Sequence, residues 1–284
     1  MTAEKCTTEK NPCEISFSNI HENTGLINFL VDSEKRKNLL LLLRGSSKTL
    51  DEIREPLRVT SSGIIPQIRK MEERHLIAQV NRKYKLTEMG SVIADYFCNF
   101  EGIEKIFKND IKYWDEHKIS AIPLEFRLRL HELGNYEIVR STPTDIFKPH
   151  SEDMRNLMNS SLMKGIAPVL YPDYPRYVSD LAEKSMDISI IITDEILEII
   201  EKTYMKEHNI YPGLKKIYLS VCHEKIEFAF LAADHFLSLR LFLKDGNYDF
   251  HEKIMSFDKS AIVWGEDLFN YYLKRSEKIG LSDI

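Results

Sequence analysis

The sequence predicts an α+β protein of two domains, in which a small helical domain precedes a larger α/β domain. Three observations support this fold class. The chain has 284 residues, more than one domain usually holds. Helix-type spacing of apolar residues dominates up to about residue 118, whereas strand-like and helix-like runs alternate afterwards. Residues 1–118 hold 19 Lys and Arg against 18 Asp and Glu, but residues 119–284 hold 20 against 26.

The domain limits follow from composition. Residues 1–20 are polar and mixed in charge, which predicts a flexible tail in which Cys6 and Cys13 are free thiols. We place the first domain at 21–118 and the second at 119–284. The four cysteines form no C-x-x-C pair, which argues against a disulfide framework or a zinc site. The start lacks the apolar segment of a signal peptide, and no window approaches about 18 uncharged apolar residues. We therefore expect a soluble, cytoplasmic protein without membrane contact.

Two helical segments open the first domain. The run "TGLINFLVDSEKRKNLLLLLRGSS" predicts a buried helix, or a helix pair interrupted near Asp32 and Ser33, and its five consecutive leucines indicate core. In "TLDEIREPLRV", Thr49 and Glu52 have the spacing of a capping box, so a short helix begins there. Pro56 is expected to bend that helix near its end.

The stretch "TSSGIIPQIRKMEERHLI" predicts a third, amphipathic helix. Its apolar residues fall within about one third of the helical wheel, and small or basic residues lie opposite. We expect Ser62 to cap this helix, which places Pro66 near the first turn, where a missing backbone donor is tolerated. Small residues at a helix start permit close approach to DNA, and the following Arg69 and Lys70 supply positive charge.

A two-stranded hairpin with a basic tip follows in "LIAQVNRKYKLTEMG", and Thr87 then starts a long helix. Three helices, a hairpin and a helix form the order of a winged helix-turn-helix, in which the third helix enters the major groove of double-stranded DNA. Residues 44–85 hold 10 Lys and Arg against 5 Asp and Glu. The predicted DNA-binding residues are Ser61, Ser62, Pro66, Gln67, Arg69, Lys70, Arg82, Lys83 and Tyr84. A solvated surface helix and a winged helix that binds protein are the alternatives.

The long helix after Thr87 predicts a homodimer. Aromatic and aliphatic residues recur at spacings of three and four, more than a small winged helix needs for its own core. They are Phe97, Phe100, Ile103, Phe107, Ile111 and Trp114. A longer core helix within one chain is the alternative.

Both ends of the chain resemble one known family. The run "LDEIREPLRVTSSGIIPQIRKMEERHLIAQVNRKYKLTEMGSVIADYF" is similar to the winged-helix half of the archaeal methanogenesis regulatory proteins, with "IPQI" and the "L…LTE.G" pattern. The run "LFLKDGNYDFHEKIMSFDKSAIVWGEDLFNYYLKRSE" resembles the C-terminal signature of that family, including Asp245-Gly246 and Trp264-Gly265-Glu266. The resemblance covers most of residues 24–278. It implies a DNA-binding transcriptional regulator with an α/β effector domain.

The second domain is predicted to be a layered α/β fold. Strand-like runs such as "YEIVRS", "DISIIIT", "KIYLSVC", "FAFLAA" and "FLSLRLFL" are separated by helical runs in the first half and follow one another in the second. The helix "SAIVWGEDLFNYYLKR" is expected to cover the sheet. We expect this domain to sense a small molecule or a partner, and a pocket at the strand ends would suit a small-molecule effector. Its candidate wall residues are Arg140, Tyr171, Thr193 and His223, each of which is alternatively a solvent-exposed strand end.

This arrangement resembles half of a phospholipase D-like fold, which raises the alternative of a phosphodiesterase or nuclease. In "HEKIEFAF", His223 and Lys225 match the His-x-Lys-x4-Asp motif of those enzymes, but Phe230 stands in place of the aspartate. The resemblance therefore implies a degenerate, non-enzymatic copy. No other catalytic or cofactor motif is present. His131, His150, His208, His235 and His251 lack ligand spacing, so we expect no metal site and no cofactor.

Overall fold

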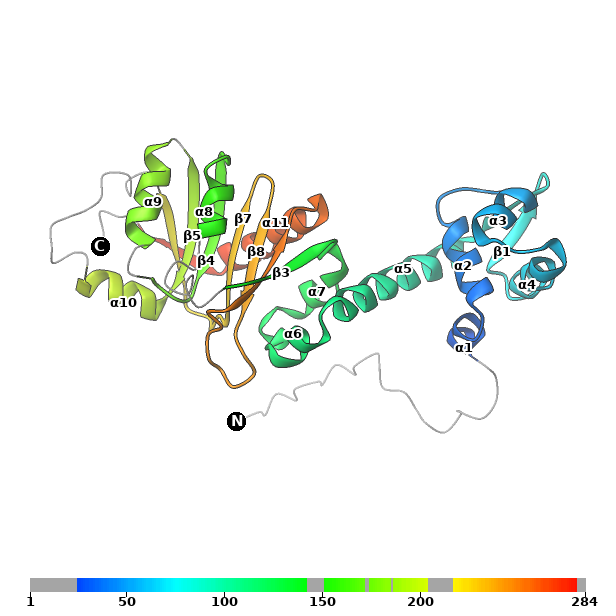
Figure 1. Ribbon diagram of the computed structural model, residues 1–284, viewed down its shortest axis with the longest axis horizontal. Coiled ribbons are helices and arrows are strands. Elements are labelled where there is room, and N and C mark those ends of the chain that lie inside the picture. The colour runs from blue at the N-terminus through cyan, green and yellow to red at the C-terminus, as the bar shows by residue number, and fades with distance from the viewer. Residues whose placement is uncertain (1–24, 142–150, 172–173, 185, 204–216, 280–284) are drawn as a thin grey trace, which may run out of the picture. The chain divides into compact units, whose positions relative to one another are not determined.

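A computed structural model describes residues 25–141, 151–171, 174–184, 186–203 and 217–279 (Figure 1). The predicted tail at 1–20, together with His150 and His208, lies outside these residues. The chain divides into two compact units, Met1–Cys98 and Asn99–Ile284, and each is described by itself. Within the described residues, no helix is both long and apolar enough to cross a membrane.

The first unit contains four helices and a hairpin before a long helix. Their bounds are α1 (Leu26–Val31), α2 (Glu34–Leu43), α3 (Leu50–Leu57), α4 (Ser61–Glu73), β1 (Ile77–Val80), β2 (Lys83–Leu86) and α5 (Glu88–Asn109). The interruption predicted near Asp32 is confirmed, and so is the capping box of Thr49 and Glu52. Apolar residues of α1 to α4 and of β1 form one core, in which Leu39, Ile64 and Met71 are fully buried.

The start of α4 differs from the prediction. Thr60, not Ser62, is the N-cap, because its side chain accepts a hydrogen bond from the Gly63 amide at 3.2 Å. Helix α4 therefore begins at Ser61, and Pro66 lies in the second turn rather than the first. Since Pro66 lacks an N–H group, the carbonyl of Ser62 has no partner four residues later in the helix.

The predicted long helix is two helices. Helix α5 ends at Asn109, and Asp110 caps α6 (Ile111–Glu116) by accepting a hydrogen bond from the Tyr113 amide at 3.0 Å. We predicted the domain boundary at 118, but the compact units divide at Cys98. The reason is that Ile106, Phe107 and Trp114 pack into the core of the second unit.

The second unit is built on an eight-stranded sheet of order β10-β6-β5-β4-β7-β8-β9-β3. Strands β4, β5 and β6 are parallel, and every other neighbouring pair is antiparallel. The strands are β3 (Tyr136–Arg140), β4 (Leu162–Ala167), β5 (Asp187–Thr193), β6 (Ile217–Cys222), β7 (Phe228–Ala233), β8 (Leu237–Leu241), β9 (Glu252–Ser256) and β10 (Ser276–Ile279). The helices are α7 (Leu124–Arg127), α8 (Ser151–Leu157), α9 (Tyr174–Glu183), α10 (Asp194–Thr203) and α11 (Lys259–Leu273), with short 3-10 turns η2 (Ile119–Ala121) and η3 (Leu130–Leu133).

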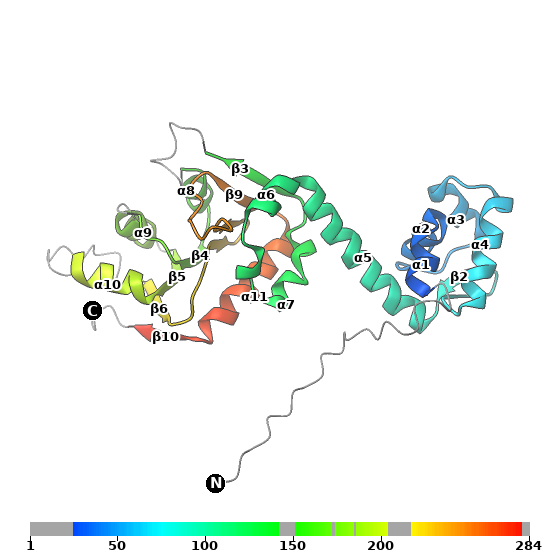
Figure 2. The ribbon, with the colours of Figure 1, turned by 90° about the horizontal axis from the view of Figure 1, so that it is seen from below.

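Helices cover both faces of the sheet (Figure 2). Helices α8 and α9 pack on one face through Leu157 and Leu181, and α10 continues this layer through Ile196. Helix α11 packs on the other face, where Trp264 and Phe269 join a large core with residues of α6 and α7. The alternation of strand side chains between two buried faces produces the long apolar runs of the sequence.

Several details of the second unit differ from the prediction. Strands β9 and β10 were not anticipated, and residues 123–133 form the short α7 followed by η3. Asp245 and Gly246 lie in a turn, since Gly246 has φ +91° and Phe242 bridges to Tyr248. A left-handed φ at this position explains the glycine.

Candidate nucleic-acid interface and ligand cavity

The outer face of α4 is small at its start and basic one turn later. Ser62, Pro66, Arg69 and Lys70 are exposed. Among the described residues, neither Arg69 nor Lys70 makes a hydrogen bond or an ion pair. No acidic residue lies in the first turn of α4, so the partial positive charge of the helix start is not offset locally. This face can therefore accept an anion.

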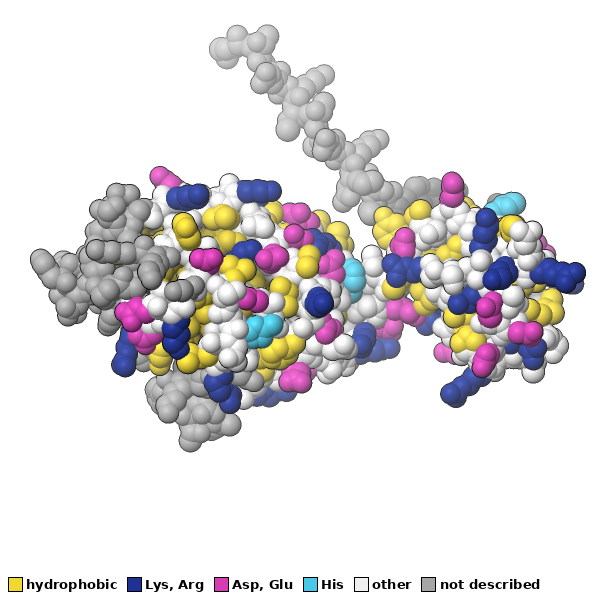
Figure 3. Space-filling view, turned by 90° about the horizontal axis from the view of Figure 1, so that it is seen from above, with side chains coloured by type: hydrophobic (Ala, Val, Ile, Leu, Met, Phe, Trp, Pro, Cys, Tyr) yellow, Lys and Arg dark blue, Asp and Glu magenta, His cyan; other side chains and the backbone are white. Residues whose placement is uncertain are grey.

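The hairpin tip adds a second basic element. Strands β1 and β2 pair from Ile77 with Leu86 to Val80 with Lys83, which leaves Asn81 and Arg82 as a two-residue turn. Both have positive φ, 50° and 63°, as a type I′ turn requires. Arg82 and Lys83 are exposed to solvent at this tip. Lys and Arg side chains project at several places on the face of the first unit seen in Figure 3.

Three predicted DNA-binding residues are half-buried rather than exposed. Gln67 is half-buried, and its Oε1 accepts a hydrogen bond from Arg36 Nη1 at 3.1 Å. Tyr84 packs against the core of the first unit, and its backbone pairs with Lys48. Ser61 is also half-buried, in the first turn of α4.

Lys35 on α2 was missed from the sequence. Its Nζ lies 3.3 Å from where a Cβ at Gly63 would stand, so it brings an exposed cation to the first turn of α4. No local pattern connects it to α4, because 28 residues separate it from Gly63.

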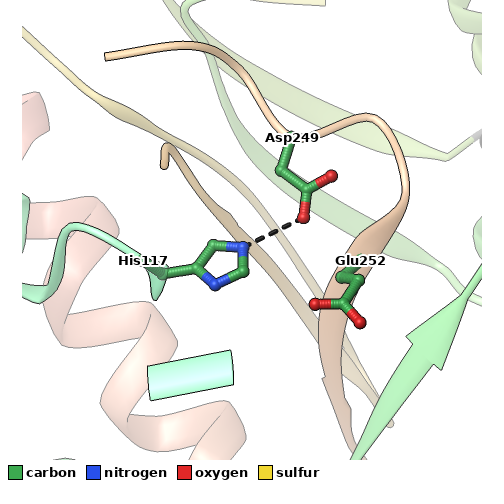
Figure 4. A group of neighbouring side chains, drawn as sticks. All are labelled: His117, Asp249 and Glu252. Carbon is green, nitrogen blue, oxygen red and sulfur yellow. Dashed lines mark hydrogen bonds and ion pairs between the residues drawn. The ribbon is translucent and has the colours of Figure 1, made fainter. Parts of the chain in front are cut away.

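In the second unit, His117 and two carboxylates form a buried cluster that joins α6 to the β8–β9 connection (Figure 4). His117 Nε2 lies 3.0 Å from Asp249 Oδ2, and His117 Nδ1 lies 2.6 Å from the carbonyl oxygen of Tyr113. Glu252 stands within 4.8 Å of both. One histidine and two carboxylates could hold a divalent cation. However, Asp249 Oδ1 also accepts from the His251 amide, and Glu252 accepts from Arg140, so these groups already satisfy one another.

The electrostatics of this cluster favour an ion pair. Burial alone lowers the pKa of His117, but the hydrogen bonds to Asp249 and to the Tyr113 carbonyl raise the pKa overall. Burial alone raises the pKa of Asp249, but its hydrogen bonds, the one to His117 foremost, lower the pKa overall. With both ring nitrogens near oxygen acceptors, the doubly protonated ring satisfies the geometry. The sequence did not suggest this pair because its members are 132 residues apart.

A cavity of about 100 Å³ lies between the sheet and helices α8 and α9. Its wall is mainly apolar, including Met154, Leu157, Met163, Leu181 and Ile190. Polar groups enter it from Asp153, Tyr174, Ser238, Arg240 and Tyr248. Arg240 is only 3% exposed. A lone arginine inside the apolar run "LSLRLFL" was the sequence signal that could have indicated this site.

None of the four predicted ligand residues lines this cavity. The Arg140 guanidinium, on the edge strand β3, pairs with Asp110 and Glu252. Tyr171 contacts the cavity wall, since its ring centroid lies 4.9 Å from that of Tyr174 and 6.5 Å from that of Tyr248. Thr193 and His223 line a different, larger cleft of about 480 Å³.

That cleft lies at the carboxyl ends of β5 and β6. His223 Nδ1 lies 2.8 Å from Asp194 Oδ1, and Lys225 pairs with Glu227 at 2.8 Å. Phe230 is 4% exposed and belongs to the core beneath α11. The position that an aspartate occupies in the phospholipase D motif is thus a buried apolar position in this chain.

Two family models match the chain. Residues 24–101 match the N-terminal domain of methanogenesis regulatory protein FilR1, and residues 146–275 match the middle domain of the same protein. Methanogenesis regulatory protein FilR1 of Methanothrix harundinacea (strain 6Ac) is 24% identical over 262 residues. That alignment covers 91% of this chain but only 59% of the relative.

Solved structures give weaker likenesses. The structure of TrmBL2, an archaeal chromatin protein described with a novel mode of DNA binding, has a TM-score of 0.41 at 15% identity, covering 88% of this chain and 97% of that one. NucT from Helicobacter pylori has a TM-score of 0.39 at 12% identity, covering 51% of this chain and 99% of that one. Scores at this level decide nothing about function. The two family models and the relative agree on one family, and the chain belongs to the methanogenesis regulatory protein FilR1 family.

Proposed function

We propose that this protein is a DNA-binding transcriptional regulator that acts in the cytoplasm, with a winged helix-turn-helix in the first unit and an effector-sensing domain in the second. The proposal rests on the exposed face of α4, where Arg69 and Lys70 have no partner among the described residues. The hairpin that follows α4 has Arg82 and Lys83 at its tip. The family supports the regulatory role.

The first unit has the elements that a winged helix requires. Helices α2, α3 and α4 are followed by the β1–β2 hairpin, and Lys48 adds a bridge to Tyr84 in front of α3. In this motif the last of the three helices enters the major groove, and the hairpin touches the DNA backbone. Helix α4 would take the groove position.

The two basic elements would then have different roles. Arg82 and Lys83 would contact phosphates, which adds affinity without reading sequence. Ser62, Arg69 and Lys70 would face base edges or the adjacent phosphates. Gln67 is a weaker candidate because Arg36 already donates to its side chain.

The test compares two variants of the full chain on duplex DNA selected from a random pool. Arg69→Ala with Lys70→Ala should reduce the difference in binding free energy between selected and random DNA. The reduction should be about 1–3 kcal/mol for each bidentate contact to a base that the variant no longer makes. Lys83→Ala should weaken both DNAs equally. Lys244→Ala, which removes an exposed cation of the second unit paired with Asp115, is the matched control and should leave both affinities unchanged. If every variant binds the selected DNA with the wild-type affinity, the proposal is wrong.

We also propose a homodimer through an exposed face of α5, which includes Phe100, one of the six residues that the sequence suggested and 66% exposed. Phe97 packs in the first unit, and Phe107 and Trp114 pack in the second. Met89, Val92 and Tyr96 instead form an exposed stripe at helical spacing, with 46%, 56% and 74% exposure. Apolar residues exposed in this pattern favour contact with a second helix.

The alternative functions make distinct predictions. A working phosphodiesterase would cleave bis(p-nitrophenyl) phosphate and lose that activity in His223→Ala. We expect no cleavage, because buried Phe230 stands where the His-x-Lys-x4-Asp motif has its aspartate, and Lys225 is paired with Glu227. A winged helix that binds only protein would bind no duplex DNA at any salt concentration.

A further inference from the structure

The cavity under α8 and α9 contains a buried charge without a charged partner. Arg240 Nη1 donates to the carbonyl oxygens of Asp249 at 2.9 Å and Glu252 at 3.4 Å. Arg240 Nη2 is buried and has no hydrogen-bond partner. Among the described residues, no carboxylate forms an ion pair with this guanidinium. A buried guanidinium of this kind is costly unless an anion or a strong acceptor meets it.

The carboxylate in the wall of this cavity does not pair with Arg240. Asp153 lines the same cavity, but its Oδ1 accepts from Lys253 Nζ at 2.7 Å, and both side chains are about 5% exposed or less. That buried pair is neutral as a whole. The positive charge of Arg240 therefore remains the excess charge of the cavity.

The hydroxyl groups around Arg240 are donors as well. Tyr174 and Tyr248 line the cavity, and burial raises the pKa of each well above its ordinary value, so both keep their protons. Arg240 also lies over the Tyr248 ring, with its Cζ 5.8 Å from the centroid. The Tyr248 hydroxyl is already hydrogen-bonded to Tyr171, so the donor that a carboxylate would meet is the buried Arg240 Nη2.

The rest of the cavity is suited to hydrocarbon. Apolar side chains of α8, α9, β4, β5 and β7 form most of its wall. Cavities of this order hold a small organic molecule, and a volume near 100 Å³ suits a tail of about three to five carbons. A phosphate dianion fits less well, because its second charge would be desolvated beside Asp153 with one guanidinium to balance it.

We propose that this cavity binds a small monocarboxylate, with its carboxylate on Arg240 Nη2 and its short apolar tail between α8, α9 and the sheet. This site rests on the proposed function, since it would be the place where the second domain senses its effector. The effector of the second domain would then be a small monocarboxylate.

The test is a thermal-shift series on the full-length protein with propionate, butyrate, valerate and octanoate, and with butyramide and butanol as uncharged matches. Butyrate and valerate should raise the melting temperature by several degrees at saturation, because they bind only the folded state. The amide, the alcohol and the longer octanoate should have little effect. Equal shifts from butyrate and butanol, or no shift from any carboxylate, would overturn the inference.

Two variants locate the site. Arg240→Met removes the charge at similar volume and should weaken carboxylate binding roughly 10- to 100-fold. Gly165→Ala keeps Arg240 but adds a methyl group to the wall, where its Cβ would meet Met163 Cε at 3.6 Å without a clash, and should weaken valerate more than propionate. Arg140→Met, which removes an arginine outside the cavity, is the matched control and should bind like the wild type. Unchanged carboxylate affinity in both Gly165→Ala and a folded Arg240→Met would place the ligand elsewhere.

DNA affinity measured with and without butyrate separates this inference from the proposed function. A carboxylate that binds through Arg240 but leaves DNA affinity unchanged would support the site and contradict the sensing role. A chain that binds DNA but none of the carboxylates would contradict the site and leave the DNA-binding proposal intact.

Discussion

Two arginines of this chain occupy positions that their backbone conformation or surroundings disfavour. Arg82 occupies a left-handed turn position that favours glycine, and Arg240 is a cation inside an apolar strand. Each placement costs free energy locally. A function that uses the positive charge explains why such residues stand there.

Arg82→Gly tests the first of these residues. The change creates an Asn-Gly pair, which suits a type I′ turn, so the free energy of unfolding of the first unit should rise by about 1 kcal/mol. Duplex DNA affinity should nevertheless fall, because the variant has no cation at this position to pair with a phosphate. Urea denaturation and a DNA titration on the same variant measure both effects. A variant that is more stable and binds DNA like the wild type would show that Arg82 is not at the interface.

The His117–Asp249 pair predicts a pH dependence of stability. The pKa of His117 is raised in the folded state. Its contribution to the free energy of unfolding is therefore complete below the unfolded-state pKa of 6.5 and is lost as pH rises through the folded-state pKa. The pKa of Asp249 is lowered, so its contribution is lost as pH falls through the folded value.

Between about pH 6 and about pH 9, the wild type should lose more stability than His117→Gln, as measured by urea midpoints. His251→Gln changes an exposed histidine near the same cluster and should keep the wild-type profile. Parallel profiles for the wild type and His117→Gln would mean that folding does not change the pKa of His117, and would contradict the ion pair.

At the scale of elements, α4 depends on its cap for its start. Thr60 accepts from the Gly63 amide, whereas the one hydrogen-bond partner of the Ser62 hydroxyl within the described part of the chain is Thr60 Oγ1, at 3.2 Å. Thr60→Ala should therefore cost about 1 kcal/mol of stability. Ser62→Ala is the control and should change stability by less than about 0.5 kcal/mol. Thermal unfolding of both variants decides which residue caps the helix, and an equal loss in the two would contradict this assignment.

The elements also show what the sequence could and could not predict. Strong periodic runs with caps, such as Thr49 to Leu57, and the apolar strand runs were predicted correctly, because their local pattern determines their structure. The break at Asp110 was missed because the apolar spacing continues across it, from Phe107 to Ile111 and Trp114. Strand β10, "SEKI", carries little apolar signal and is held by pairing with β6.

The sites were predictable only where they are local in the sequence. The basic residues of α4 and the hairpin lie within 15 residues and were found together. The cavity draws residues from Asp153 to Tyr248, and the His117 cluster joins two distant segments, so only the folded chain brings them together. Arg140, chosen as a strand-end cation, is instead held by Asp110 and Glu252 at the edge of the sheet.

At the scale of the whole molecule, the exposed stripe on α5 predicts the oligomeric state. Val92→Glu with Tyr96→Glu should convert a dimer to a monomer, because two charges would be buried without partners in the interface. Ser91→Glu adds a charge on another face of the same helix and should leave the dimer intact. Sedimentation velocity measures the mass of each variant. A wild type that is monomeric at all concentrations, or a double variant that is still dimeric, would contradict an α5 interface.

The most direct test of the account is the salt dependence of duplex DNA binding by the full chain. The wild type should bind random duplex DNA at low salt, with an affinity that falls steeply as salt rises. Replacing Arg69, Lys70, Arg82 and Lys83 with alanine should flatten that dependence by roughly one unit of slope for each phosphate that the variant no longer neutralises. Circular dichroism first confirms that the variant is folded. A wild type that does not bind at low salt, or a folded variant with the wild-type slope, would contradict the claim that α4 and the hairpin form the DNA-binding surface.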